Sequence, residues 1–273
     1  TLRVQLVDYP DAPPVIMANS VDRIEISFDE FSDERTYLRY ELIHCDAEWR
    51  PEGLVDSEFL DGFNIADVED WAFSRNTLAH YVHYAITLPN EQMVPLISGN
   101  YLVRVFKEED PDTTVLQARF SIVEPLMKVQ GDVTSRTDIE TNDRMQQVEF
   151  VVDTQEERVD NLYGGDLKVI VSQNGRQDNE LMVRSPLRVD GTKAVYEHMR
   201  PLIFPAGNEY RRFEVSSVHF PGMRVKHVLH AEPFYHFELW DDEPRFAQRY
   251  TYDSTQFGRF RVREYNSAES DLE

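Results

Sequence analysis

The chain has 273 residues, enough for two domains of ordinary size, each with its own hydrophobic core. Its formal net charge of −22 argues against binding to a nucleic-acid backbone or to an anionic membrane surface. A hydrophobic content of 41% excludes a disordered chain, and an aromatic content of 12% favours strands, where rings pack well on a pleated surface.

The acidic charge is uneven along the chain. Residues 1–124 carry 24 acids and 9 bases, whereas residues 125–273 carry 26 acids and 19 bases. The single cysteine excludes an intramolecular disulfide, and no apolar run approaches the ~20 residues of a membrane-spanning helix. Because the chain begins without a methionine or a signal region, we expect a mature or trimmed chain from which any export signal has been removed.

Apolar and polar residues alternate along most of the chain. Leu38, Tyr40 and Leu42 would share one face of a strand, with Arg39 and Glu41 on the other. The same period of two predicts strands at residues 23–28, 38–42, 82–88, 101–105, 116–123, 148–152, 167–171, 213–218, 225–230, 234–239 and 260–263.

Turn signals separate these segments. Gly164-Gly165, Asp190-Gly191 and Pro221-Gly222 mark turns, and Asn174-Gly175 after an apolar run predicts the clearest hairpin turn. The acidic run 108–112 lacks the full pattern of a calcium loop, so we interpret it as a hairpin turn. Helical periodicity is weak everywhere, with a short helical turn predicted around residues 67–73.

Many short strands at near-regular spacing predict an all-β fold of two immunoglobulin-like antiparallel β-sandwich domains in tandem. We place the boundary near Glu124, because the next residue, Pro125, breaks a strand pattern. The expected domains are an acidic immunoglobulin-like sandwich at 1–124 and a second β-sandwich at 125–273. Ser98-Gly99-Asn100-Tyr101 is typical of a late sandwich strand whose tyrosine hydroxyl bonds to an upstream backbone group.

The cysteine does not form a recognisable nucleophilic site. His44 and Cys45 are adjacent in an apparent strand, so their side chains should point to opposite faces and cannot readily pair as thiolate and imidazolium. We expect Cys45 to be a buried structural residue. No Gly-x-Ser-x-Gly motif is present.

Metal and cofactor motifs are also missing from the sequence. His80 and His83, and likewise His227 and His230, are three residues apart, a spacing that separates two side chains in a strand. Glycine-rich phosphate loops are lacking. We therefore predict no catalytic residue, no metal ligand and no cofactor.

The order of polar and aromatic residues in several segments resembles that of one protein family, and the match covers almost the whole chain in consistent order. The matching residues are His44-Cys45, Trp49, 59–64, Ser74, Asn76-Thr77, Tyr81, His83-Tyr84, Pro89-Asn90, 98–101, 173–176, 207–211 and 264–267. Together they are similar to the N-terminal region of the plug protein family of the type IX secretion system, formerly a domain of unknown function.

The resemblance implies a non-catalytic periplasmic protein, associated with the outer membrane, that binds and seals a large outer-membrane β-barrel translocon. We also expect no nucleic-acid partner, no direct membrane insertion and a monomeric state. Proteins of the family usually continue beyond the segment that matches Glu264-Tyr265-Asn266-Ser267, so we expect a further C-terminal module. No catalytic residues are carried over from the family.

The strongest candidate for a partner contact is the stretch of residues 33–70, which has 12 acids and 3 bases. It includes a long connection between predicted strands, and connections carry function more often than cores do. The predicted partner-binding residues are Glu52, Asp56, Glu58, Phe59, Asp61, Phe63 and Trp71.

Two other functions stay open at this point. The first is a carbohydrate- or surface-binding β-sandwich, in which Trp49, Phe59, Phe63, Trp71 and Phe73 form a stacking platform. The second is an enzyme with a carboxylate pair, which requires a pocket that holds two acids, one of them with a raised pKa.

Overall fold

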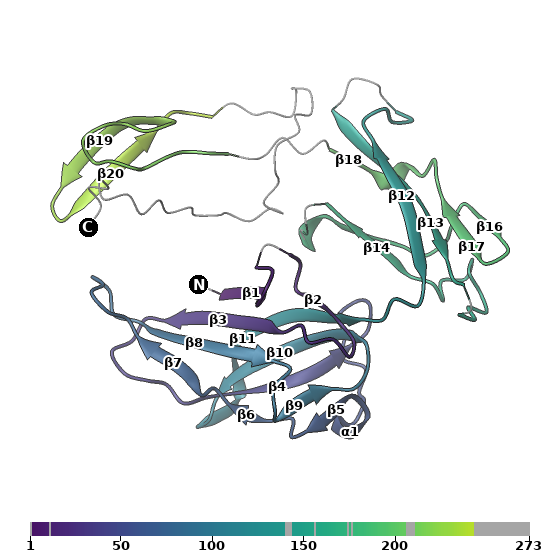
Figure 1. Ribbon diagram of the computed structural model, residues 1–273, viewed down its shortest axis with the longest axis horizontal. Helices are drawn as coiled ribbons and strands as arrows, with labels where there is room; N and C mark the ends of the chain where they lie inside the picture. The colour runs from purple at the N-terminus through teal and green to yellow at the C-terminus, as the bar shows by residue number, and fades with distance from the viewer. Residues whose placement is uncertain are drawn as a thin grey trace. The chain divides into compact units, whose positions relative to one another are not determined.

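A computed structural model describes residues 2–10, 12–139, 144–155, 157–173, 175, 177–205 and 211–242. The chain divides into two compact units, Thr1–Leu126 and Met127–Glu273. Both are built from strands, nearly all of them paired antiparallel, which confirms the predicted all-β class (Figure 1). Among the described residues no helix has the length and apolar character needed to cross a membrane.

The first unit contains two main sheets and one short ribbon. One sheet has the order β1 (Leu2–Leu6), β3 (Ile24–Glu30), β8 (Val82–Leu88), β7 (Asp70–Phe73). The other has the order β2 (Val15–Met17), β11 (Asp110–Val123), β10 (Gly99–Lys107), β4 (Leu38–Cys45), β6 (Ala66–Asp67), and only β2 and β11 run parallel. The helix α1 (Asp56–Phe59) precedes the ribbon of β5 (Leu60–Gly62) and β9 (Met93–Pro95).

The core of the first unit lies between its two sheets. Every second residue of β4 is buried, and Tyr40 and Leu42 pair across the strands with Val105 and Val103 of β10. Buried residues of β3 and β8 belong to the same cluster, so the inner faces of both sheets form one hydrophobic core. Period-two alternation creates this core because it gives each strand one apolar face.

Two local predictions in the first unit are confirmed. The Tyr101 hydroxyl donates a hydrogen bond to the backbone oxygen of Ile97 at 2.7 Å. Its ring stacks on Phe120, with the ring centroids 5.3 Å apart. Residues Lys107 and Asp110 pair across the β10–β11 hairpin, so the acidic run contains the predicted turn.

The helical turn predicted around residues 67–73 is wrong. That segment forms β6 and β7, and β7 pairs with the edge of β8 from Asp70 to Phe73. An exposed sheet edge offers a full ladder of backbone hydrogen bonds, whereas a single helical turn recovers few. The helix lies earlier, at α1, where the Glu58 carboxylate accepts a hydrogen bond from the Val55 backbone at 2.9 Å.

The second unit is built around one five-stranded sheet. Its order is β12 (Lys128–Thr134), β13 (Met145–Asp153), β17 (Lys193–Tyr196), β16 (Arg188–Asp190), and β18 (Ile203–Pro205) also pairs with β13. Two ribbons accompany it, β14 (Val169–Ser172) with β15 (Glu180–Val183), and β19 (Val225–Ala231) with β20 (Phe234–Leu239). The 3₁₀ helices are η1 (Gln177–Asn179) and η2 (Arg200–Leu202).

The core of the second unit joins this sheet to the β14–β15 ribbon. Phe150 of β13 stacks on Tyr196 of β17 with ring centroids 4.7 Å apart, and Val183 of β15 belongs to the same buried cluster. Within the described part of the chain, this cluster contains far fewer buried residues than that of the first unit.

Several predictions for the second unit differ from the structure or cannot be compared with it. Residues 213–218 are not a strand, and Phe213 is exposed, because alternation produces a strand only where a partner strand is present. Asn174, residues 207–210 and residues 260–267 lie outside the described residues. The segments on either side of Asn174-Gly175 do pair, as β14 and β15, with η1 in their connection.

Candidate functional site

The predicted contact region folds around the β5–β9 ribbon. Asp61 pairs with Val94, and the neighbouring residues Leu60 and Met93 are buried. Because side chains alternate along a strand, Asp61 and Val94 point outward. We call the exposed residues on this outer side the ribbon face: Asp61, Phe63, Val94 and Leu96.

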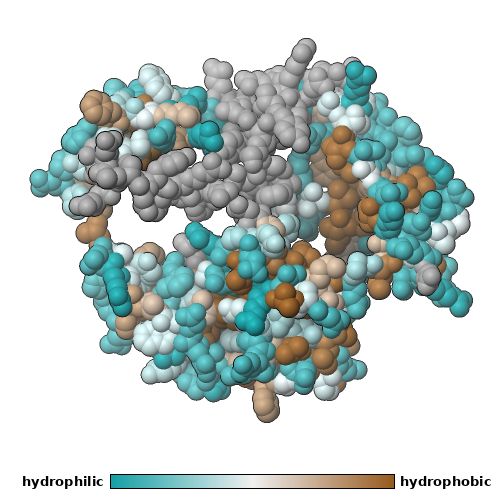
Figure 2. All heavy atoms as spheres, viewed as in Figure 1, coloured by the Kyte–Doolittle hydropathy of each residue, from teal (hydrophilic) through white to brown (hydrophobic). Residues whose placement is uncertain are grey.

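The ribbon face combines one carboxylate with three apolar side chains. Phe63 is 81% exposed, the most exposed aromatic side chain among the described residues of the chain. Figure 1 shows α1, β5 and β9 together at one end of the first unit. In Figure 2 hydrophobic residues lie among hydrophilic ones on the visible side of this unit. A site of this composition suits contact with another macromolecule better than it suits catalysis.

The close pairing of the ribbon requires a glycine next to Asp61. Gly62 has φ +112°, a conformation that L side chains rarely adopt, and a Cβ here would collide with the backbone oxygen of Gln92. The Phe63 backbone then donates to that same oxygen at 3.1 Å. Glycine is therefore required at position 62 by the backbone conformation, and this conformation also exposes the next residue, Phe63, to solvent.

Two asparagines fasten the ribbon to the rest of the unit. The Asn64 side chain bonds both backbone groups of Leu42, accepting from N–H at 2.9 Å and donating to the carbonyl oxygen at 3.0 Å. The Asn90 oxygen accepts from the Met93 backbone at 2.9 Å, and its nitrogen donates to the Tyr40 hydroxyl at 2.8 Å. Both asparagines belong to the segments that carry the family resemblance, and here they stabilise the fold.

Three of the predicted contact carboxylates have partners within the unit. Glu58 caps α1, and Asp56 accepts a hydrogen bond from Asn64 at 2.8 Å. Glu52 lies 2.8 Å from Nδ1 of His44. Their charges therefore organise the loop, while Asp61 lies on its exposed side.

His44 is a buried core residue at this end of the unit. Its Nε2 donates to the Ser98 carbonyl at 3.2 Å, and its ring meets the Tyr101 ring edge-on, with the ring centroids 5.1 Å apart. Gly99 allows this approach, because a Cβ there would collide with the imidazole. Histidine can act as a base or as a metal ligand, but the side chain of His44 packs in the core.

Cys45 is buried, as predicted. Burial raises the pKa of its thiol, and the thiol donates a weak hydrogen bond to the Ile43 carbonyl at 3.7 Å. A thiolate is the reactive form of cysteine, so a raised pKa in an apolar site makes Cys45 inert.

Neither Phe59 nor Trp71 belongs to the ribbon face. Phe59 is 3% exposed and packs in the core near His44, so its ring cannot form part of an exposed platform. Trp71 lies on β7, towards the other end of the unit (Figure 1). The Arg35 guanidinium covers the Trp71 ring at 4.6 Å, which occupies a face that a sugar would need for stacking.

The structure thus places two of the predicted contact residues, Asp61 and Phe63, on the ribbon face together with Val94 and Leu96, which were not predicted. The available signal was the alternation of Met93-Val94-Pro95-Leu96 directly after Pro89-Asn90. This segment was too short to identify as a strand by its pattern, because a three-residue strand provides little periodicity.

A shallow hollow of about 240 Å³ lies elsewhere in the first unit. It is lined by Ser32, Asp33, Phe73, Ser74, His80 and Tyr81. His80 Nδ1 lies 2.7 Å from the Asp33 carboxylate at this exposed site. The hollow contains one carboxylate, whereas a glycosidase-type site requires two.

The second unit holds a group that the sequence did not predict. Among the described residues, Asp138, Glu149 and His198 are the one set of three whose potential metal-ligand atoms all lie within 4.8 Å of one another. The hydrogen bond to Asp138 raises the pKa of His198, and the Gln147 amide lowers the pKa of Asp138. No motif spacing links these distant positions, so the sequence offered no signal for the group.

These features define an all-β protein whose first unit exposes one carboxylate beside three apolar side chains on the ribbon face. Residues 1–124 match the model of the type 9 secretion system plug protein 1st domain. The whole chain is 35% identical to a hypothetical protein from Parabacteroides merdae, of known crystal structure, with a TM-score of 0.87 over 100% of this chain and 68% of that one. Residues 1–124 of the chain thus belong to the type IX secretion system plug protein family, a family of the cell envelope.

The other comparisons add little. The structure of Pseudomonas fluorescens alkylpurine DNA glycosylase AlkC, bound to DNA containing an abasic site analog, was also found. The alignment covers 45% of this chain and 30% of the glycosylase chain. Its identity is 7% and its TM-score is 0.25, a level that supports no argument about fold or function. No curated protein matches the sequence.

Proposed function

We propose that this protein is a non-catalytic periplasmic plug that binds and seals the outer-membrane translocon barrel of the type IX secretion system through its ribbon face. Membership of the plug family supports a role in type IX secretion. The ribbon face, which lies within the matched residues, is the observation that carries the choice of surface.

The chemistry of the ribbon face suits a reversible contact. Phe63 provides a protruding aromatic anchor, the kind of residue that dominates binding energy when it enters a pocket. Val94 and Leu96 add a modest apolar area, and small interfaces are typical of contacts that form and dissociate. We propose a partner surface with an apolar pocket and a basic rim, which would complement Asp61.

Electrostatics would act mainly on the approach of the two proteins. Residues 1–124 carry 24 acids against 9 bases, so the whole first unit is attracted to a basic rim. Complementary charge of this kind raises association rates and specificity more than affinity, and salt weakens it. We therefore expect binding to weaken as salt concentration rises.

We further propose that the first unit is an immunoglobulin-like sandwich. Its seven principal strands can be lettered A to G in chain order, as β1, β3, β4, β7, β8, β10 and β11. With these letters one sheet has the order A-B-E-D, and the other contains C-F-G. This is the immunoglobulin arrangement, and the Tyr101–Ile97 hydrogen bond corresponds to its tyrosine corner.

For the second unit the same proposal has less support. Its five-stranded sheet is joined through a shared core to the two-stranded β14–β15 ribbon. The proposal of two tandem domains, with the boundary near Glu124, rests on the sequence break at Pro125.

The test is recovery of the translocon from native envelopes. The full-length tagged protein is incubated with envelope extract in mild detergent, and bound proteins are identified and quantified at two salt concentrations. We expect a very large outer-membrane β-barrel protein to be recovered. Phe63→Ser should weaken its binding by about ten-fold or more, because loss of an interface anchor costs about 2 kcal/mol.

The chain offers matched controls for both kinds of substitution. Phe31 is 80% exposed but follows β3 at the end of the unit away from the ribbon, so Phe31→Ser should leave binding unchanged. For the charge, Asp61→Lys is compared with Glu109→Lys in the β10–β11 turn. Asp61→Lys should weaken binding and reduce its salt dependence, and Glu109→Lys should do so less.

Each outcome bears on a separate part of the proposal. Equal losses for Phe63→Ser and Phe31→Ser would exclude the ribbon face while keeping the plug function. Recovery of no barrel protein would reject the plug function, and recovery of glycans instead would favour a carbohydrate- or surface-binding module. Gel filtration of the purified protein tests the proposed monomeric state, and fractionation of cells tests the periplasmic location.

A further inference from the structure

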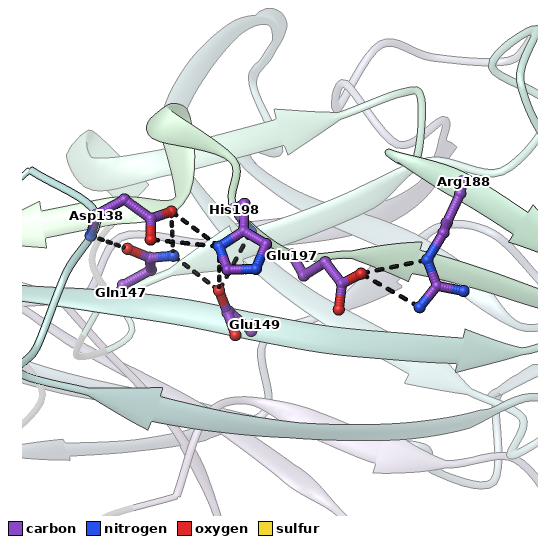
Figure 3. A network of polar contacts seen from close by, with 6 residues as sticks. All are labelled: Asp138, Gln147, Glu149, Arg188, Glu197 and His198. Atoms are coloured by element: carbon purple, nitrogen blue, oxygen red, sulfur yellow. Dashed lines mark hydrogen bonds and ion pairs between the residues drawn. The ribbon is translucent and has the colours of Figure 1, made fainter.

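The second unit brings one imidazole and two carboxylates together from distant parts of the chain. Asp138 lies in the connection between β12 and β13, Glu149 lies on β13, and His198 follows β17 (Figure 3). His198 Nδ1 is 3.2 Å from both carboxylate oxygens of Asp138 and 3.5 Å from Oε1 of Glu149. Figure 3 shows the three side chains pointing toward one another.

A buried amide holds the two carboxylates in place. Gln147 is 2% exposed, and its nitrogen donates to Asp138 at 2.9 Å and to Glu149 at 2.8 Å. Its oxygen accepts from the Asp138 backbone at 2.8 Å. The backbone N–H of His198 donates a hydrogen bond to the Glu149 carboxylate at 3.2 Å, which fixes the backbone position from which the imidazole extends. Such outer hydrogen bonds orient the ligands of metal sites.

We propose that Asp138, Glu149 and His198 form a binding site for a divalent transition-metal ion of the zinc class. Protein ligands bind Zn²⁺ at about 2.0–2.2 Å, so two ligands at tetrahedral or octahedral angles lie about 3.0–3.4 Å apart. The separation of His198 Nδ1 from Asp138, 3.2 Å, lies within this range, and its separation from Glu149, 3.5 Å, is slightly longer. This site does not rest on the plug function.

The donor set selects the class of ion. An imidazole nitrogen with two carboxylate oxygens suits zinc and its neighbours, whereas calcium takes six to eight oxygen ligands and magnesium retains several waters. Asp138 and His198 are exposed and Glu149 is partly buried, so an ion can enter from solvent, and water can complete its coordination.

The neighbouring carboxylate of Glu197 does not compete for the ion. Glu197 precedes His198 in the chain, but its carboxylate pairs with the Arg188 guanidinium at 3.2 Å, away from the three ligands (Figure 3). The site therefore places two carboxylates and one imidazole around the ion, so that a divalent cation is neutralised.

The test is zinc binding to the full chain with any affinity tag removed and after treatment with a chelator. Zn²⁺ is titrated by calorimetry, and we expect one site that also raises the melting temperature through its preference for the folded state. His198→Asn and Asp138→Asn should each weaken binding by at least about ten-fold. Nitrogen-15 NMR of the imidazole should identify Nδ1 of His198 as the metal-bound atom.

Controls separate the site from general surface binding. His83 pairs with Asp29 at 2.7 Å in the first unit, a histidine with a single carboxylate, so His83→Asn should not change zinc affinity. Melting curves of the metal-free variants check that each still folds. The proposal would be overturned by absence of zinc binding, by His198→Asn or Asp138→Asn binding zinc as tightly as the unaltered protein, or by equal affinity for Mg²⁺.

Discussion

Strands β4 and β12 have similar patterns in the sequence but different surroundings in the fold. In β4 every second residue is buried, whereas every residue of β12 is exposed, including Val129 at 64%. Val129 pairs across the strands with Val152, which is buried in the core of the second unit. Cross-strand partners lie on the same side of a sheet, so Val129 points to the core side and is nevertheless uncovered.

The difference comes from what lies on each side of the strand. β4 is an inner strand, between β10 and β6, and its apolar side faces buried residues of the opposite sheet. β12 is an edge strand, beyond the reach of the small β14–β15 ribbon that covers the middle of its sheet. Alternation thus specifies which side of a strand is apolar, while burial requires a second layer.

The same contrast applies to two histidines that each lie beside a glutamate. His44 is enclosed by Tyr101 and bonded to the Ser98 carbonyl, so it acts as a part of the core. His198 faces Glu149 at an exposed site, with Asp138 at ion-pair distance. A histidine beside a glutamate therefore belongs to the core in the first unit and to a candidate ion site in the second.

The largest expected effect is on the core of the first unit. Phe120→Ala removes a buried ring that stacks on Tyr101, and we expect a loss of about 3–5 kcal/mol in the free energy of unfolding. Urea unfolding followed by tryptophan fluorescence measures this, because Trp49 and Trp71 both belong to the first unit. A loss below about 1 kcal/mol would show that the two-sheet core is not closed around this ring.

A smaller but clear effect is expected at the ribbon. Asn90→Ala removes the acceptor for the backbone of buried Met93 and the donor to the Tyr40 hydroxyl. The Met93 N–H keeps a longer bond of 3.3 Å to the Asn90 backbone oxygen, so the main cost comes from the buried Tyr40 hydroxyl, which loses its donor. We expect a loss of about 1–3 kcal/mol, and the same urea titration measures it. Asn90→Asp, which keeps the acceptor, should recover part of the loss, whereas equal losses would mean that the acceptor contributes nothing.

Acid should destabilise both units through specific carboxylates. The Arg50 backbone N–H lowers the pKa of Asp46 in the first unit, and the Thr192 hydroxyl lowers the pKa of Asp153 in the second. A folded-state pKa below the unfolded value of about 3.9 gives stability that is present above that value. That stability is lost as the pH falls through the lower, folded-state pKa.

The measurement compares urea midpoints at pH 7 and at successive values below pH 4. Asp46→Asn keeps an oxygen acceptor but cannot ionise, so the first unit of this variant should lose less stability on acidification than the parent. Asp112→Asn, at an exposed position of β11, serves as the control. An unchanged pH dependence in Asp46→Asn would contradict the assignment.

The smallest effect is expected at the edge of the second unit. Val129→Thr keeps the branched shape and changes an exposed side chain, so the free energy of unfolding should change by less than about 0.5 kcal/mol. A loss above 1.5 kcal/mol would instead show that β12 is covered in the intact protein. That result would remove the contrast with β4.

Much of the fold could be predicted because its signals are local. The period of two identified β4, β8 and β10, the acidic turn joined β10 to β11, and the spacing around Tyr101 indicated its backbone hydrogen bond. The same reasoning failed at residues 67–73 and 213–218. There the outcome depended on whether a partner strand was available, and no local pattern contains that information.

The sequence by itself determined the all-β class, the apolar side of the main strands, the burial of Cys45 and the family. The first three follow from side-chain alternation and residue type along one short stretch at a time, and the family follows from the resemblance of several segments. Only the tertiary structure decided that Phe59 is a core residue, that Glu58 caps a helix and that Asp61 and Phe63 share the ribbon face. It also assembled Asp138, Glu149 and His198. The physical reason is that burial and hydrogen-bond partners are set by contacts between distant segments, which exist only once the chain has folded.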